Sequence, residues 1–240
     1  MCTVTWFHTA AGYELFFNRD ELDGRAPEEP VSVQDHPDGA YLAPRDPEGG
    51  GTWLAVSADG WTLALLNGDE REMDAPEGGW LSRGRIIPDL IHAPRQSLHE
   101  LELKRFRPFT LLKLGPNAEL GATAWDGRSS SARNVRPKHG PLTSSGVDPQ
   151  ATDAGRRQLL DAALETSGMH RETFLAFHRI PGDGAVLGHG PCVRREGIHT
   201  RSLCHVVVDA MDVSMAHAAG PPDRTPLGPP VRLARTPRLP

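Results

Sequence analysis

A β-hairpin is predicted by residues Cys2–Glu21, which read CTVTWFHTAAGYELFFNRDE. Cys2–His8 alternates in polarity and is rich in threonine, valine and aromatic residues, as strands are. The turn Ala10-Ala11-Gly12 follows, and Tyr13–Phe17 has the composition of the returning strand. Pairing across a turn centred on Ala11 places residue 2 opposite about residue 20.

The next segment is predicted to be a long loop followed by a second hairpin. Asp20–Gly51 is polar and rich in proline and glycine, so a long irregular loop is expected there. A second hairpin is predicted where Trp53–Val56 and Trp61–Leu66 flank Asp59-Gly60, because Asp-Gly favours tight hairpin turns.

The rest of the chain alternates between helical and strand patterns. An α+β domain with mainly antiparallel sheets is expected over 1–222, followed by a Pro- and Arg-rich, disordered tail at 223–240. The predicted helices are Leu81–His92, Ser97–Arg105, a helix capped by Thr152 or Asp153 and stopped at Gly168, and Arg171–His178; the predicted strands are Phe109–Leu114, Glu119–Trp125, Leu203–Val208 and Met211–Ala216.

Composition excludes several classes of partner and location. The 26 basic and 31 acidic residues leave a net charge of −5, which offers no basic surface for nucleic acid or an anionic membrane. Three cysteines cannot close a disulfide framework and fit a reducing compartment. No run approaches the roughly 18 apolar residues of a membrane span, and no secretory signal is recognised. We therefore expect a cytoplasmic protein.

Common catalytic and metal-binding motifs are missing from the sequence. It contains neither a P-loop nor a G-x-S-x-G nucleophile elbow. Five cysteine and histidine residues gather late in the chain, but their spacing matches no zinc finger, so no metal site is expected. They are His189, Cys192, His199, Cys204 and His205.

Cys2 is the strongest candidate for chemistry. Removal of Met1 would leave Cys2 with a thiol and a free α-amine, whose pKa of about 7.7–8.0 suits a general base. A cation lowers the pKa of a nearby thiol, and the hairpin brings Arg19 back beside residue 2. The alternative is a small buried strand residue without chemistry, and the residues alone favour neither interpretation.

A family resemblance adds weight to the catalytic interpretation. It rests on five motifs: Met1–Val4, Phe17–Glu21, Pro44–Asp46, Gly50–Leu54 and Ala64–Asn67. Through this set, in this order, the chain resembles the NRDE family, also called Transport and Golgi organisation 2. That resemblance implies an N-terminal-nucleophile hydrolase-like fold, a four-layer αββα sandwich of two antiparallel sheets between helices. Haem or acyl-lipid handling has been proposed for the family, without a settled reaction.

The resemblance also implies roles for individual residues. The implied fold is shared with conjugated-bile-acid and penicillin V acylases. By that likeness, Cys2 is nucleophile and base, Arg19 lies beside its thiolate, and Asn67 matches a polar oxyanion-site residue. Those acylases carry an aspartate three residues after the arginine, where this chain has Leu22. Asp20 is therefore the first choice, and Glu21 the second, for holding the α-amine.

Further residues of these motifs are candidates for substrate binding. They are Asn18, Glu21, Arg45, Thr52 and Trp53. Arg45 and Asp46 either pair with each other or line the pocket, and the sequence leaves both alternatives open.

Two functions of different class follow. The first is an amidohydrolase-like enzyme that cleaves the C–N amide or acyl bond of a small molecule through a Cys2 thioester, without a cofactor. The second is a non-catalytic carrier of a lipid, acyl thioester or haem on the same fold.

Overall fold

The hairpin at the start of the chain forms as predicted. In the computed structural model, strand β1 (Cys2–Thr9) pairs antiparallel with β2 (Gly12–Leu22), and Ala10 and Ala11 make the turn. The register places Cys2 opposite Arg19, one residue from the predicted position, because the turn has two residues and is not centred on Ala11. Since neighbouring side chains of a strand point to opposite faces, this difference decides which faces Arg19 and Asp20 occupy.

The structure describes residues 2–69, 73–96, 98, 101–133, 135, 140–145, 148–183 and 188–236. Within them the hairpin is the centre of one sheet, sheet A, with the strand order β10-β1-β2-β13-β12-β11 and with β14 and β15 continuing beyond β13. All pairs are antiparallel except the short β11–β12 pair. The other strands of sheet A are β10 (Leu142–Ser144), β11 (Pro181–Gly182), β12 (Cys192–Arg195), β13 (Ile198–Val208), β14 (Asp212–Ala218) and β15 (Val231–Ala234).

The second sheet, sheet B, is an antiparallel meander in which every strand pairs with the next in sequence. Its strands are β3 (Glu29–Gln34), β4 (Tyr41–Arg45), β5 (Leu54–Ser57), β6 (Thr62–Asn67), β7 (Phe109–Leu114), β8 (Leu120–Trp125) and β9 (Ser130–Ala132).

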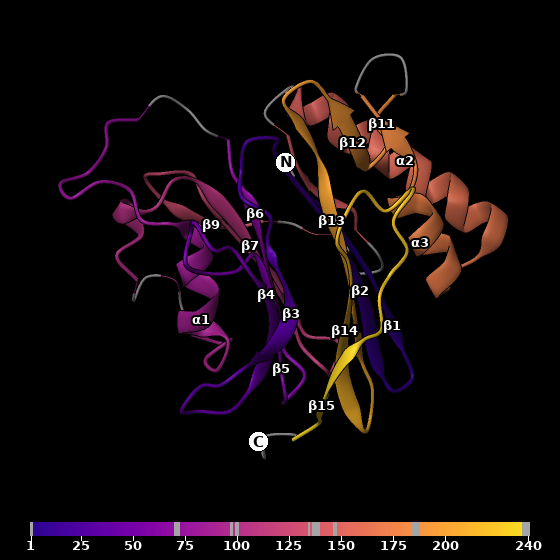
Figure 1. Cartoon of the computed structure of the whole chain (residues 1–240), viewed down its shortest axis with the longest axis horizontal. Helices are drawn as coiled ribbons and strands as arrows, with labels where there is room; N and C mark the ends of the chain where they lie inside the picture. The colour runs from indigo at the N-terminus through magenta and orange to yellow at the C-terminus, as the bar shows by residue number, and fades with distance from the viewer. Residues whose placement is uncertain are drawn as a thin grey trace.

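Helices cover the outer face of each sheet (Figure 1). On sheet B lies α1 (Ile86–Leu90), directly after the 3-10 turn η1 (Arg83–Arg85). The 3-10 turn η3 (Leu103–Arg105) contributes Leu103 to the same apolar cluster. On sheet A lie α2 (Pro149–Ser167) and α3 (Arg171–His178). The predicted α+β fold, a four-layer αββα sandwich, is confirmed.

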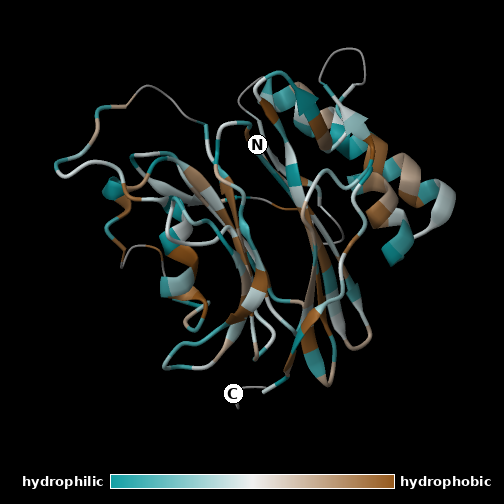
Figure 2. Cartoon of the chain, viewed as in Figure 1, coloured by the Kyte–Doolittle hydropathy of each residue, from teal (hydrophilic) through white to brown (hydrophobic). Residues whose placement is uncertain are grey.

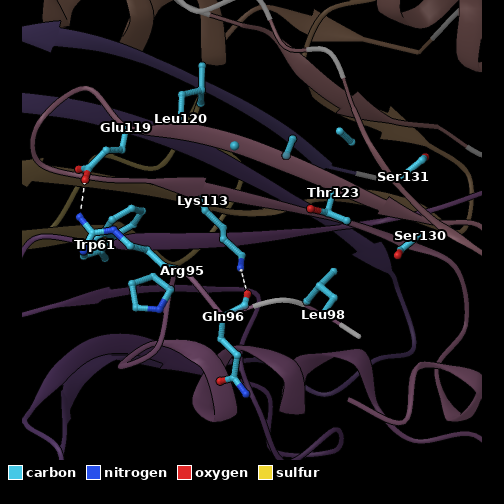
Figure 3. Close-up of a pocket in the computed structure, with 14 residues that line it drawn as sticks. Trp61, Arg95, Gln96, Leu98, Lys113, Glu119, Leu120, Thr123, Ser130 and Ser131 are labelled. Atoms are coloured by element: carbon cyan, nitrogen blue, oxygen red, sulfur yellow. Dashed lines mark hydrogen bonds and ion pairs between the residues drawn. The ribbon is translucent and has the colours of Figure 1, made fainter. Parts of the chain in front are cut away.

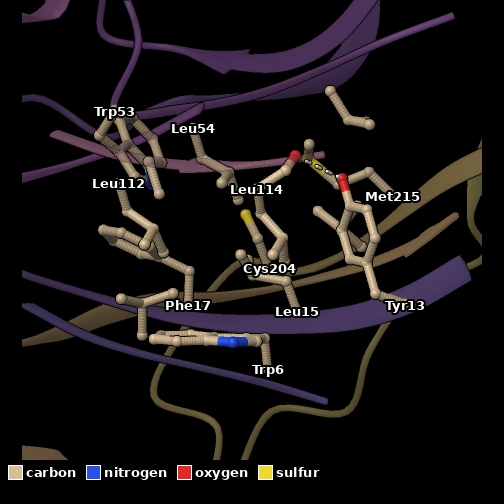
Figure 4. Close-up of a cluster of buried hydrophobic side chains, with 14 of the residues drawn as sticks. Trp6, Tyr13, Leu15, Phe17, Trp53, Leu54, Leu112, Leu114, Cys204 and Met215 are labelled. Carbon is tan, nitrogen blue, oxygen red and sulfur yellow. Dashed lines mark hydrogen bonds between the residues drawn. The ribbon is translucent and has the colours of Figure 1, made fainter. Parts of the chain in front are cut away.

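The two sheets meet in an apolar core. Trp6, Leu15 and Phe17 of sheet A face Leu54 and Leu112 of sheet B (Figure 4). Hydrophobic residues run along the strands of both sheets and occur on α1 (Figure 2). Because side chains of both inner faces interdigitate there, this layer holds the sheets together.

Local signals predicted most elements correctly. The hairpin of β5 and β6, the pair β7 and β8, helix α3 and the pair β13 and β14 are confirmed. Helix α2 stops at Gly168, as predicted, but begins earlier: Asp148 is its N-cap and accepts a hydrogen bond from the Ala151 N–H. The predicted helix Ser97–Arg105 lies partly outside the described residues, and its described end forms only η3.

Two segments expected to be irregular contain strands. Asp20–Gly51 holds the end of β2 together with β3 and β4, and the tail holds β15, which pairs with β14. The expectation of a disordered tail is therefore wrong for Val231–Ala234, while 237–240 lie outside the described residues. Both β3 and β15 are edge strands with mostly exposed or half-exposed residues, so neither has the apolar pattern that predicts a strand.

Among the described residues, no helix has the length and apolar character needed to cross a bilayer.

Candidate active site

Cys2 lies at the start of β1, between two neighbouring strands. It pairs with Ser144 of β10 on one side and with Arg19 of β2 on the other. Its backbone nitrogen donates a hydrogen bond to Ser144 Oγ at 2.9 Å. The side chain is 6% exposed and belongs to the core between the sheets, with Val4 and Trp6 of the same strand.

Arg19 shares this inner face with Cys2, because directly paired residues of two strands have side chains on the same face. Its buried guanidinium lies 3.2 Å from a Glu21 oxygen and 3.1 Å from a Glu28 oxygen. It also stacks over Trp53, 4.4 Å from the ring centroid. Two carboxylates thus compensate the charge of this arginine, and an aromatic ring fixes its position.

The thiol of Cys2 responds mainly to burial. Burial raises the pKa of Cys2, and the nearby Asp20 carboxylate raises it further. The backbone of Asp20 and the Arg19 guanidinium lower it, but not enough to outweigh burial. The sequence predicts the direction of the effect of Arg19 and misses the larger effect of burial.

Asp20 lies on the opposite face of the sheet from Arg19, towards the helices. Its buried carboxylate accepts a hydrogen bond from Thr200 Oγ1 at 2.5 Å. Burial raises the pKa of Asp20, against the opposing effects of Arg156 and Thr200. Arg156, which is buried on α2, donates to Thr3 Oγ1 at 2.6 Å and so reaches the strand of Cys2. Asp20 therefore belongs to a buried charged group behind the strand of Cys2.

Glu28 completes the set of residues around Cys2 on the inner face of sheet A. This set is called the inner group and consists of Cys2, Arg19, Glu21, Glu28, Ser144 and His217. One of its oxygens bonds Arg19, and the other lies 3.6 Å from His217 Nε2 of β14. Burial acts to raise the pKa of Glu28, but His217 and Arg19 lower it to about 2. Glu28 is therefore a carboxylate at neutral pH and joins β14 to the arginine beside Cys2.

The remaining predicted residues lie in different surroundings. Asn18 is fully buried, and its amide donates to the carbonyls of His178 (2.9 Å) and Pro191 (3.0 Å). Thr52 is buried, and its hydroxyl donates to the Leu54 carbonyl within its own turn. These contacts tie chain segments together.

Arg45 and Asn67 are not joined to the inner group by any contact within the described residues. Arg45 is exposed at the end of β4, and Asp46 pairs with Arg25 at 2.6 Å instead of with Arg45. Asn67 pairs with Phe109, whose side chain packs on the α1 side of sheet B. The register thus assigns Asn67 to the outer face of that sheet.

Three residues of the inner group were missed by sequence reasoning: Ser144, Glu28 and His217. No local motif marks them. Ser144 reaches Cys2 only through strand pairing across 142 positions, and Glu28 stands in a segment expected to be a loop.

The five late cysteine and histidine residues are spread over the fold. Cys204 lies between the sheets, whereas His205 faces the helices and lies 2.7 Å from Glu14. His199 contacts Asp23 at 2.5 Å. Within the part of the chain that is described, no three histidine, cysteine or acidic residues form a group able to hold a metal ion.

The fold has two stacked sheets covered by helices, with Cys2 at the start of a strand of sheet A, and it is the N-terminal-nucleophile hydrolase-like fold. Two solved structures share it. One is a Caenorhabditis elegans N-acylethanolamine-hydrolyzing acid amidase ortholog, with TM-score 0.56, 11% identity, and coverage of 88% of this chain and 94% of that chain. The other is penicillin V acylase from Agrobacterium tumefaciens, with TM-score 0.50, 11% identity, and coverage of 92% of this chain and 84% of that chain.

Sequence comparison identifies the family. The family model described as Transport and Golgi organisation 2 matches residues 1–178 of the 240. The chain therefore belongs to the Transport and Golgi organisation 2 family, as its motifs predict. No curated protein sequence matches it.

Proposed function

We propose that this protein is a cysteine N-terminal-nucleophile amidohydrolase, which cleaves the C–N amide or acyl bond of a small molecule through a Cys2 thioester once Met1 is removed. The observation that carries the proposal is the position of Cys2 at the start of β1, with its nitrogen on Ser144 and Arg19 beside it. Two proteins of the same fold are named as an amidase and an acylase, which supports this class of reaction.

The proposed reaction uses the two functional groups of Cys2. The neutral α-amine accepts the proton of the thiol, and Sγ forms a bond to the carbonyl carbon while the carbonyl electron pair moves to oxygen. On collapse the C–N bond breaks, and the leaving nitrogen takes the proton from the α-ammonium. A water molecule then gives a proton to the α-amine as its oxygen attacks the thioester. The C–S bond breaks, the acid is released and Sγ recovers a proton.

Ser144 is the proposed positioning residue for the amine. Its hydroxyl oxygen accepts a hydrogen bond from the nitrogen that becomes the α-amine when Met1 is lost. Accepting one N–H orients the nitrogen without protonating it, which a general base requires. Asp20, across the sheet, is proposed to support the ammonium form electrostatically.

Arg19 is proposed to stabilise the thiolate, in balance with Glu21 and Glu28. Asn67 and backbone N–H groups are the proposed oxyanion donors, a kind of contact worth about 2.7–4 kcal/mol. Asn67 would have to turn from the outer face of sheet B to act, so its role is the first to test by substitution to alanine.

The decisive experiment compares two chains that differ only at the nitrogen of Cys2. One is released from a cleavable fusion so that Cys2 is its first residue, and the other keeps an N-terminal extension. Iodoacetamide labelling followed by intact mass between pH 5 and 9, and hydrolysis of penicillin V and an N-acylethanolamine, are measured on both. We expect faster labelling and hydrolysis only in the chain that starts with Cys2.

Two variants of the processed chain complete the test. Cys2→Ala is expected to abolish hydrolysis, whereas Cys192→Ala, which removes another buried thiol, is expected to retain it. Undiminished hydrolysis by Cys2→Ala, or by the extended chain, would contradict the proposal.

One observation favours a second function, a non-catalytic carrier. Burial raises the pKa of Cys2, and two carboxylates compensate Arg19, so the thiol is protonated in the unprocessed chain. A carrier of lipid, acyl thioester or haem would copurify with its ligand, detected by mass or by a Soret band. Cys2→Ala would then lower ligand retention with no hydrolysis to lose. A cytoplasmic location stays a prediction under both functions.

A further inference from the structure

A cavity of about 580 Å³ lies away from Cys2, against β7 and β8 of sheet B. Lys113 of β7 projects into it from the outer face of the sheet, because its neighbours Leu112 and Leu114 face the core between the sheets. In Figure 3, Lys113 lies between Arg95 and Glu119 on one side and Thr123 and Ser130 on the other. The cavity is large enough for a small organic molecule.

The open space beside Lys113 exists because its partner on the next strand is a glycine, which has no side chain. Gly121 of β8 is the residue directly paired with Lys113. A Cβ atom at Gly121 would have no heavy atom within 4 Å. Any other residue at this position would project beside the lysine, so the glycine keeps the space above the ammonium open.

Among the described residues that line the cavity, the charged side chains leave one cation in excess. Arg95 and Glu119 form an ion pair at 2.6 Å, and Arg95 also lies over the ring of Trp61, 5.4 Å from its centroid. The half-buried Lys113 ammonium, with three hydrogen atoms to donate, makes one hydrogen bond within the described residues, to the Gln96 carbonyl at 2.9 Å. The half-buried ammonium is incompletely solvated, and this burial lowers the pKa of Lys113.

The walls combine apolar and hydroxyl groups. Trp61, Pro94 and Leu98 supply apolar surface, and Thr123 with Ser131 supplies hydroxyl groups. A ligand with a flat apolar body and one anionic group matches both the walls and the charge.

We propose that this cavity binds a small organic carboxylate, whose anionic group pairs with the Lys113 ammonium above Gly121 and whose apolar body lies against the Trp61 side. A charge-assisted hydrogen bond to the ammonium supplies the affinity for the carboxylate. The site is on the opposite side of sheet B from Cys2, so the inference does not depend on the proposed hydrolase chemistry.

Benzoate is the probe, and isothermal titration calorimetry on the full chain is the measurement. Benzamide has the same shape without the charge, and inorganic phosphate has charge without the apolar body. We expect saturable benzoate binding in the millimolar range or tighter, and affinities at least about tenfold weaker for benzamide and phosphate.

Three variants locate the binding. Lys113→Met is expected to weaken benzoate binding about tenfold or more, and Gly121→Leu to abolish it by filling the open space. Lys104→Met removes the same charge from an exposed lysine and should bind like the parent. Thermal melting of each variant shows that it is folded.

Several outcomes would overturn the inference. No saturable benzoate binding would do so, as would equal binding by Lys113→Met or Gly121→Leu. Benzamide binding as tightly as benzoate would show that charge is irrelevant. Phosphate binding as tightly would show an inorganic anion site in place of an organic carboxylate site.

Discussion

Replacing Glu14 by glutamine tests how α3 is held to sheet A. Glu14 on β2 lies in a buried position, where both of its oxygens accept hydrogen bonds from Arg171 of α3 at 2.8 Å. One oxygen also lies 2.7 Å from Nε2 of the buried His205 on β13. Burial acts to raise the pKa of Glu14, but His205 and Arg171 lower it to about 2.

The magnitude follows from linkage. The ordinary pKa of this carboxyl is 4.5, so the folded state lowers it by about 2.5 pH units, and at about 1.36 kcal/mol per unit the carboxylate contributes about 3 kcal/mol at pH 7. Because the pKa is lower in the folded state, this stabilisation is complete above pH 4.5 and is lost as the pH falls towards 2. At pH 3 about 1.4 kcal/mol remains.

Glu14→Gln should therefore lower the free energy of unfolding by up to about 3 kcal/mol at pH 7. For a chain of this size the loss corresponds to a fall in Tm of about 6–12 °C, and to less than half of that at pH 3. Differential scanning calorimetry at both pH values measures it.

Glu172→Gln is the matched control for this prediction. It makes the same chemical change on α3, where the Glu172 side chain is 77% exposed and contacts His170. Its Tm should stay that of the parent protein. Equal Tm losses for the two variants at pH 7, or equal losses for Glu14→Gln at pH 7 and pH 3, would refute the assignment.

Three further results are expected. Tyr13→Phe removes a buried hydroxyl that donates to Thr62 Oγ1 at 2.6 Å. It should lower the free energy of unfolding, measured in urea, by about 1–3 kcal/mol. Tyr41→Phe, at the only other tyrosine, should lower it much less. Ser144→Ala should shift the pH profile of iodoacetamide labelling of the chain that begins with Cys2, and an unchanged profile would show that the hydroxyl does not act on the amine. Because all three cysteines are buried, Ellman's reagent should detect fewer than one thiol in the native unprocessed chain and three in denaturant; fast native reaction would contradict that burial.

Patterns within short segments determined much of this fold. The alternation of Cys2–His8 and the Asp59-Gly60 turn predict two hairpins that the structure contains. The helical pattern ending at Gly168 likewise predicts α2, whose start alone was displaced. In each case the physical cause is local, because turn preferences and side-chain periodicity act between neighbours in sequence.

The same local patterns did not predict the edge strands. Strand β3 begins Glu29-Pro30 and has one buried residue, Val31, so its sequence is that of a loop. Strand β15 lies in a Pro- and Arg-rich tail and exists through pairing with β14. Hydrogen bonds to the neighbouring strand, and not an apolar face of their own, stabilise these strands, so their own composition does not mark them.

The sequence by itself determined that Cys2 begins a strand whose hairpin partner carries Arg19 and Asp20. Only the tertiary structure decided that Arg19 shares the inner face with Cys2 while Asp20 lies behind the sheet, since a register difference of one residue exchanges the two faces. The same holds for Ser144, which reaches Cys2 from a distant segment, and for Glu28, which reaches Arg19 from the residue just before β3. The position of Cys2 at the start of a strand is a local feature of the chain, but its surroundings come from pairing between strands, because side-chain environments depend on which segments pack together.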